Sequence, residues 1–178
     1  GDNQCAKLIV PMDYANPTAG TVQLAVLKVP STGNGRNGTL VVNPGGPGGS
    51  GVEYAQAADR VLTPDLLKAY DIVGFDPRGV GASDPLKCLT GAQLDQFLAT
   101  DGSPDTPAET AAIDSESRDL GARCQAADAT LAANIGSTSV VKDMDILRAA
   151  LDQPQLNYLG FSYGTYLGAL YADEFVGR

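Results

Sequence analysis

Two patterns of apolar residues alternate along most of the chain, and together they predict an α/β fold. Short apolar runs typical of buried strands occur at Leu40–Val42, Asp71–Phe75 and Leu156–Phe161. Stretches with helical spacing lie at Val52–Leu67 (interrupted at Pro64), Ser139–Leu151 and Thr165–Phe175. This alternation predicts a mostly parallel central sheet flanked by helices.

Two segments depart from this rhythm. Lys7–Val10 and the alternating run Thr21–Val29 predict a pair of strands, joined by a turn rich in Asn, Pro and Gly. Residues 90–137 are rich in Ala, Asp, Thr and Ser, and they predict a helical surface excursion in which Ala108–Leu131 is the stronger helix. We therefore expect residues 1–178 to form one part of a single domain that carries this excursion.

The composition narrows the classes of partner and cofactor. The 178 residues are 43% hydrophobic and 19% charged, which is typical of a globular protein. A net charge of −9 argues against nucleic acid or an anionic membrane as partner. No apolar run is long enough to span a bilayer. The chain lacks histidine and Cys-x-x-Cys spacing, so we expect neither a metal nor a cofactor.

The segment Gly160-Phe161-Ser162-Tyr163-Gly164 carries the strongest chemical signal. A nucleophilic serine stands on a sharp turn from strand to helix, where backbone crowding requires small residues two positions to either side. Gly160 and Gly164 meet that requirement, so the pattern predicts Ser162 as a nucleophile. The alternative is an ordinary glycine-rich turn between a strand and a helix.

A second glycine-rich turn, residues 43–51, follows the strand Leu40–Val42 directly. Acyl-transfer enzymes place a backbone N–H of such a turn where the oxyanion forms. The same residues also fit the Gly-x-Gly-x-x-Gly pattern of dinucleotide-binding proteins, with Asp76 as the ribose ligand. Pro44 and Pro47 argue against that alternative because they remove N–H donors from a phosphate cradle.

A third motif follows the strand Asp71–Phe75. Its sequence, residues 74–83, is Gly-Phe-Asp-Pro-Arg-Gly-Val-Gly-Ala-Ser. Asp76 and Arg78 could act in catalysis, but a structural ion pair or a turn-capping role is the favoured interpretation. Glycines within the motif allow a tight turn.

These three motifs, in this order, resemble those of the secreted bacterial tripeptidyl aminopeptidases and the related proline iminopeptidases. The opening Cys5–Tyr14 and the pair Tyr171-Ala172 are also similar, so the resemblance covers nearly the whole chain. It implies an α/β-hydrolase fold and a secreted or extracytoplasmic serine peptidase that releases short peptides from free N-termini. By position, Ser162 is the nucleophile, and the N–H groups of Tyr163 and Gly46 are the oxyanion donors.

The chain departs from that family after the nucleophile. Only residues 163–178 follow Ser162, and without histidine the chain has no general base. We therefore expect the fold to be incomplete after the nucleophile strand and helix. The catalytic Asp and His and the lid are expected on a C-terminal half that is a separate polypeptide or has been removed. The alternatives are an esterase or lipase on the same fold and a non-catalytic binding module.

The chain contains three cysteines, Cys5, Cys88 and Cys124. Composition alone allows one disulfide with an odd thiol, or three free thiols. A helix of the excursion that folds back over the sheet would bring Cys88 and Cys124 together. The pattern therefore predicts a Cys88–Cys124 disulfide and leaves Cys5 as the odd residue.

Overall fold

The computed structural model describes residues 2–33 and 37–178, and these residues form two compact units. The larger unit consists of residues up to Pro85 together with Ile135–Arg178, and the smaller unit is Leu86–Asn134. The smaller unit overlaps the segment 90–137, for which the sequence predicts a helical surface excursion.

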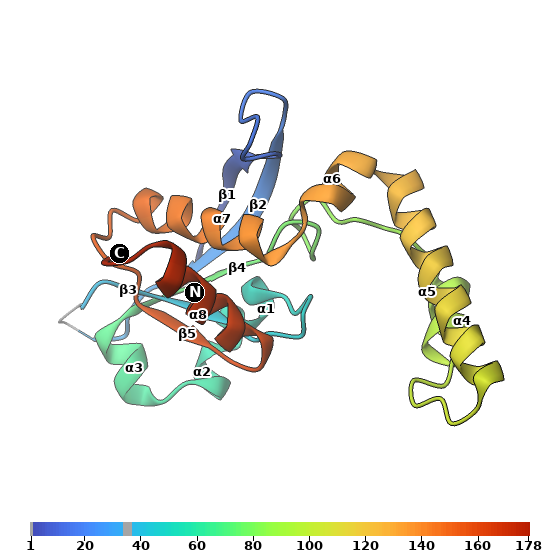
Figure 1. Ribbon diagram of the computed structural model, residues 1–178. Helices are drawn as coiled ribbons and strands as arrows, with labels where there is room; N and C mark the ends of the chain where they lie inside the picture. Colours follow the sequence, from blue (N-terminus) through green and yellow to red (C-terminus); the bar gives the residue numbers. More distant parts are fainter. Residues whose placement is uncertain (1, 34–36) are drawn as a thin grey trace. The chain divides into compact units, whose positions relative to one another are not determined.

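The larger unit is built on a sheet with the order β1-β2-β4-β3-β5 (Figure 1). Its strands are β1 (Gln4–Pro11), β2 (Thr21–Val29), β3 (Thr39–Asn43), β4 (Asp71–Phe75) and β5 (Tyr158–Gly160). β3 pairs in parallel with both β4 and β5, whereas β1 and β2 form an antiparallel pair that joins β4 through β2. The predicted N-terminal strand pair and the parallel strands are confirmed, although β5 is shorter than the apolar run 156–161.

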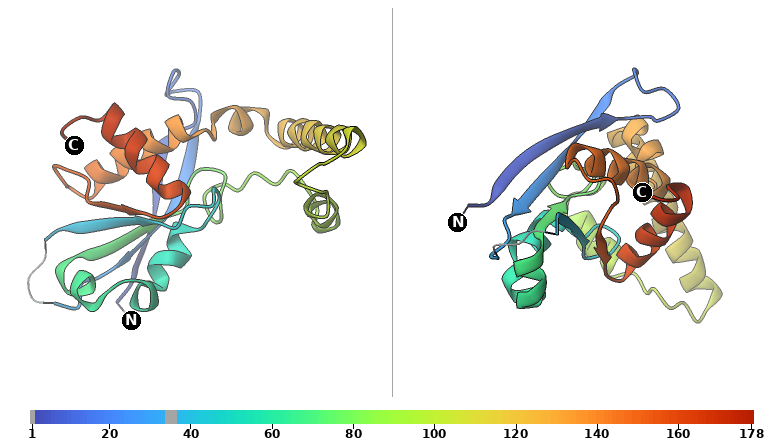
Figure 2. Two further views of the ribbon diagram at one scale, coloured as in Figure 1. Left: turned by 60° about the horizontal axis from the view of Figure 1, so that its bottom comes forward. Right: turned by 90° about the vertical axis from the view of Figure 1, so that its left-hand side faces the viewer.

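Helices cover the two faces of this sheet, as Figures 1 and 2 show. One face carries α1 (Gly51–Gln56), α2 (Ala58–Val61) and α3 (Pro64–Ala69), and the other carries α7 (Ser137–Ala150) and α8 (Tyr163–Glu174). Alternate residues of a strand point to opposite faces. Leu40 and Val42 accordingly belong to the core cluster that includes Ala55 and Ala58 of α1 and α2.

α1 lies unusually close to the sheet, and two glycines permit this. A Cβ atom on Gly51 would come within 2.1 Å of the Phe75 carbonyl oxygen, and one on Gly74 within 1.9 Å of the Gly51 carbonyl oxygen. These contacts place the end of the glycine-rich turn directly against β4. The predicted helical stretch Val52–Leu67 is divided into three helices, with Pro64 as the first residue of α3.

The smaller unit contains α4 (Gly91–Leu98), α5 (Pro107–Ala127) and α6 (Ala129–Asn134). Capping boxes at Thr90 and Thr106 begin α4 and α5. The helix predicted at Ala108–Leu131 ends at Ala127, so that boundary was wrong. Asp128 has an extended backbone and its carboxylate accepts a hydrogen bond from the Leu131 N–H at 2.8 Å, which starts the next helix. A disulfide joins Cys88 to Cys124 within this unit, and Cys5 is free and exposed.

Candidate active site

Ser162 occupies a sharp turn between β5 and α8. Its backbone angles are φ 50° and ψ −121°, a combination that a residue with a side chain adopts only at an energetic cost. The side chain is exposed, and no hydrogen bond to its Oγ exists among the described residues. A strained, exposed serine between a strand and a helix has the geometry of a nucleophile elbow.

The glycines beside Ser162 are required by contacts within the turn. A Cβ atom on Gly160 would lie 2.4 Å from the Gly164 carbonyl oxygen, and one on Gly164 would lie 2.9 Å from the Asn43 carbonyl oxygen. The first contact is across the elbow itself, and the second is with the end of β3. The crowding expected from the sequence is therefore present.

The glycine-rich turn packs directly against this elbow. A Cβ atom on Gly45 would lie 2.8 Å from the Tyr163 nitrogen and 3.0 Å from the Ser162 Cβ. Gly45 has a φ of 89°, and its N–H donates to Asn43 Oδ1 at 2.8 Å, so both its conformation and its position favour glycine. The backbone of the glycine-rich turn at Gly45 therefore lies directly beside Ser162 and Tyr163.

Gly46 and Tyr163 are the predicted oxyanion donors. Gly46 is exposed with a φ of 111°, and its N–H donates no hydrogen bond to the described residues. Tyr163 is the first residue of α8, a position whose N–H has no partner within the helix. Both groups are therefore free to donate, and their role in catalysis stays a prediction.

Asp76 organises the loops around the site. Its carboxylate is buried and accepts from Ser50 Oγ at 2.6 Å, from the Val52 N–H at 3.2 Å and from the Ala82 N–H at 2.9 Å. Ser50 is the N-cap of α1, so Asp76 ties the glycine-rich turn to the loop after β4. A carboxylate occupied in this way is unavailable to a ribose, which argues further against the dinucleotide alternative.

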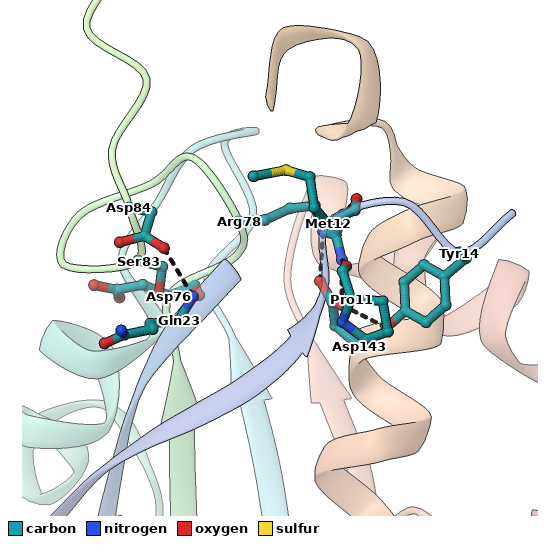
Figure 3. Close-up of polar contacts among 9 residues, drawn as sticks. All are labelled: Pro11, Met12, Tyr14, Gln23, Asp76, Arg78, Ser83, Asp84 and Asp143. Atoms are coloured by element: carbon teal, nitrogen blue, oxygen red, sulfur yellow. Dashed lines mark hydrogen bonds and ion pairs between the residues drawn. The ribbon is translucent and has the colours of Figure 1, made fainter. Parts of the chain in front are cut away.

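Arg78 and Asp143 form a buried pair that joins three elements (Figure 3). Both side chains are fully buried, and Arg78 donates from Nε to Asp143 Oδ2 at 2.8 Å and from Nη2 to Oδ1 at 2.6 Å. The guanidinium also donates to the carbonyl oxygens of Pro11, the last residue of β1, and of Met12, which follows it. The structural ion pair expected for Arg78 is present, and its partner on α7 was missed because nothing local marks a pairing 65 residues apart.

Tyr14 completes this network. Its hydroxyl donates to Asp143 Oδ1 at 2.7 Å. Burial, followed by the negative charge of Asp143, holds the pKa of the Tyr14 hydroxyl well above its usual value. Tyr14 therefore remains a hydrogen-bond donor throughout the physiological pH range, and the Asp143 carboxylate is well satisfied.

Ser83 and Asp84 fix the other end of the loop that carries Arg78 (Figure 3). The Ser83 hydroxyl donates to the Asp76 carbonyl oxygen at 2.7 Å and accepts from the Ala25 N–H at 2.7 Å. Asp84 accepts from the Gln23 N–H at 2.8 Å. The third sequence motif is therefore held to β2 as well as to α1 and α7.

A cavity of about 390 Å³ opens beside the elbow and the glycine-rich turn. Gly45 and Tyr163, which adjoin Ser162, are among the residues that line it. Its other walls include the apolar side chains of Pro47, Val80, Ile135, Val140 and Leu167. All of these residues belong to the larger unit.

Within 2–33 and 37–178, no group of His, Cys, Asp and Glu side chains could hold a metal ion. No helix in the same part of the chain is both long and apolar enough to cross a membrane.

Curated relatives align with this chain over most of its length. The serine protease Hip1 of Mycobacterium tuberculosis is 40% identical over the whole chain, and the tripeptidyl aminopeptidase of Streptomyces lividans is 40% identical over 97% of it. A carboxylesterase B of Mycobacterium tuberculosis is 44% identical over 83% of the chain. The chain spans about a third of the length of these relatives, with 34%, 33% and 29% of each covered.

Solved structures share the fold at low sequence identity. A proline iminopeptidase-related protein from Thermus thermophilus matches 97% of the chain with a TM-score of 0.50 and 18% identity, and the chain covers 41% of it. An epoxide hydrolase from Vigna radiata matches 99% with a TM-score of 0.51 and 13% identity, and 36% of it is covered. The model of the α/β hydrolase fold family matches residues 38–178. The strand order, the elbow at Ser162 and these matches agree, and the chain belongs to the α/β-hydrolase fold family.

Proposed function

We propose that this chain is the nucleophile-bearing part of a serine exopeptidase that releases short peptides from free N-termini. The observation that carries the proposal is Ser162, held at a φ of 50° on an elbow against which the Gly45 turn packs. A binding module has no need of a strained, exposed serine, because strain of this kind is retained where function requires it.

In the proposed mechanism, Ser162 Oγ gives its proton to a general base and attacks the carbonyl carbon of the substrate. The tetrahedral intermediate then collapses, the C–N bond breaks, and the same proton passes to the leaving amine, so that an acyl-enzyme remains on Ser162. The N–H groups of Gly46 and Tyr163 donate to the oxyanion of the tetrahedral intermediate. The general base, a histidine oriented by a carboxylate, belongs to a C-terminal part that accompanies this chain, because the chain itself contains no histidine. Water then releases the acyl group.

Similarity along the chain supports a peptidase over an esterase. The serine protease and the tripeptidyl aminopeptidase align with 100% and 97% of the chain, whereas the carboxylesterase aligns with 83% of it at a slightly higher identity. Because the carboxylesterase is slightly more identical but aligns with less of the chain, an esterase on the same fold is the second candidate. The proposed location is extracytoplasmic, which accords with the Cys88–Cys124 disulfide.

The test compares three substrates of the complete protein, that is, this chain together with its C-terminal part. We expect a tripeptide p-nitroanilide with a free amino group to be cleaved with a kcat/KM at least tenfold above that of its N-acetylated form. Ser162→Ala should abolish cleavage of both p-nitroanilides. The matched control is Ser139→Ala on α7, which should leave their cleavage unchanged. Hydrolysis of p-nitrophenyl butyrate alone, with no cleavage of either amide, would identify an esterase instead.

A further inference from the structure

The cavity beside the elbow has the position of a substrate subsite. Gly45 and Tyr163 both line it, and a Cβ on Gly45 would lie only 3.0 Å from the Ser162 Cβ. The cavity therefore adjoins the backbone on both sides of the candidate nucleophile, although Ser162 itself does not line it. In a peptide substrate, the side chain on the Cα atom next to the attacked carbonyl is the group expected to enter this cavity, because it can do so while the substrate backbone stays beside Ser162.

The chemistry of the walls selects the kind of substituent. Val80, Ile135, Val140 and Leu167 supply apolar surface from the loop after β4, from the residues at the start of α7, and from α8. The volume of about 390 Å³ is at the lower end of the range for ligand pockets, and it is ample for one large side chain.

The hydroxyl groups and the guanidinium group of the walls are already paired. Ser137 Oγ and the Tyr163 hydroxyl lie 2.6 Å apart in a hydrogen bond. Arg78 also lines the cavity, but its guanidinium charge is neutralised by Asp143 at 2.6 Å. A charged substrate side chain would thus lose water without gaining a counter-ion, which is unfavourable. An apolar side chain meets no such penalty.

We propose that this cavity is the subsite for the side chain of the residue whose carbonyl group Ser162 attacks, and that it selects uncharged, apolar side chains. Ile135 and Val80 are specificity-determining residues in this scheme. The proposal rests on the proposed function, since it assigns a substrate class to the same nucleophile.

Ile135 offers the most direct variants because it is 39% exposed, so a larger side chain can be accommodated there without unfolding. Ile135→Trp narrows the cavity, and Ile135→Ala widens it. Ile9→Trp is the matched control, since Ile9 is 63% exposed on β1 and does not line the cavity. Each variant of the complete protein is assayed with peptide substrates that carry Ala, Leu, Phe, Lys or Glu at the attacked carbonyl.

The wild-type protein should prefer Leu or Phe to Lys or Glu by at least about tenfold in kcat/KM. Ile135→Trp should lower the ratio of Phe to Ala cleavage by about 10–100-fold, and Ile135→Ala should shift it in the opposite direction. Ile9→Trp should leave the ratio unchanged. A second series varies the leaving residue at a fixed acyl group, and its selectivity should not respond to either Ile135 variant.

The outcomes separate this subsite from the function on which it rests. Unchanged acyl selectivity in both Ile135 variants, with normal fluorophosphonate labelling of Ser162, overturns the subsite and leaves the serine hydrolase intact; this result is also expected if the C-terminal part fills the cavity. A change confined to the leaving-residue series assigns the cavity to the other side of the scissile bond and likewise overturns the proposal. Absence of both labelling and hydrolysis in the wild-type protein overturns the proposed function and the subsite together.

Discussion

Ser162 and Gly45 show how single residues set up the candidate site. Ser162 carries the unfavourable backbone conformation, with a φ of 50°, and Gly45 relieves the crowding because any Cβ there would lie 2.4 Å from the Phe161 carbonyl oxygen. The strain at one residue persists because the surrounding backbone fixes it. Glycine at position 45, which packs against Ser162 in space, is therefore a steric requirement of the elbow.

Arg78 joins the loop after β4 to α7 and to the end of β1, which leads to the first prediction. Arg78→Leu leaves the Asp143 carboxylate buried without its counter-ion, so the free energy of unfolding should fall by about 3–5 kcal/mol. The double variant Arg78→Leu/Asp143→Leu removes both charges and should recover a large part of that loss. Urea denaturation measures both effects.

Arg118→Leu is the control for this experiment. Arg118 pairs with Asp114 on α5 at 3.7 Å, but its side chain is 82% exposed, so its loss should change the free energy of unfolding by less than about 0.5 kcal/mol. If Arg78→Leu lowers the free energy of unfolding no more than Arg118→Leu does, the buried Arg78–Asp143 pair does not stabilise the fold.

At the scale of the elements, α7 and α8 are joined through Asp145. The Asp145 carboxylate accepts from Arg148 Nε at 2.9 Å, from the Tyr171 hydroxyl at 3.1 Å and from Arg178 Nη1 at 2.8 Å. Partial burial acts to raise the pKa of Asp145, but the hydrogen bonds from Arg148 and Tyr171 hold this pKa below its usual value. The charged carboxylate is thus the form that stabilises the contact between the helices.

A pH-dependent prediction follows from Asp145. Because its folded-state pKa lies below the unfolded value, its stabilisation is present above about pH 4 and is lost as the pH falls through the folded pKa. Asp145→Asn should lower the free energy of unfolding by about 1–2 kcal/mol at pH 7, and the difference from wild type should shrink below pH 4. Denaturant curves between pH 3 and 7 measure it. Asp173→Asn, at an exposed position on α8, is the control and should change the free energy of unfolding at pH 7 by less than about 0.5 kcal/mol.

The disulfide is the main constraint on the smaller unit. α4 and α5 contain no buried residues, so the apolar surface that they bury is small. The Cys88–Cys124 bond closes a loop with a sequence separation of 36, which stabilises a folded unit by about 3–4 kcal/mol in the chain-entropy model.

The corresponding prediction concerns hydrogen exchange. The double variant Cys88→Ala/Cys124→Ala should raise amide exchange across α4 and α5 while leaving β3 and β4 protected. Cys5→Ala, which removes a free exposed thiol, should change neither. Non-reduced peptide mapping of the wild-type protein provides the independent check, and a cross-link between Cys5 and either of the other cysteines would contradict the pairing.

At the scale of the whole molecule, the chain belongs to the α/β-hydrolase fold family. It spans about a third of its curated relatives, and β5 pairs with β3 alone among the described strands. The fourth prediction is that a fluorophosphonate labels Ser162 rapidly only when the C-terminal part is present, because the proposed mechanism takes its general base from that part. Intact-mass measurement of labelled protein, with Ser162→Ala as the blank, provides the readout. Rapid labelling of the isolated 178-residue chain would locate a base within it.

The sequence by itself determined the local features of the site. The glycines around Ser162 predict an elbow because their spacing reflects contacts between residues four positions apart, and the apolar runs predict β3 and β4 because those strands are buried on both faces. The start of α6 was missed, although Asp128, a good N-cap residue, was a local signal inside the predicted helix. Such signals are local, so a pattern along the chain is sufficient to reveal them.

Only the tertiary structure decided which distant residues meet. Arg78 and Asp143 are 65 residues apart, and Ser137 and Tyr163 are 26 apart, so no local spacing encodes either contact. The cavity likewise needs walls from β3, the loop after β4, α7 and α8 at once. A sequence pattern specifies which face of each element is buried, whereas the packing of elements against one sheet specifies which side chains touch.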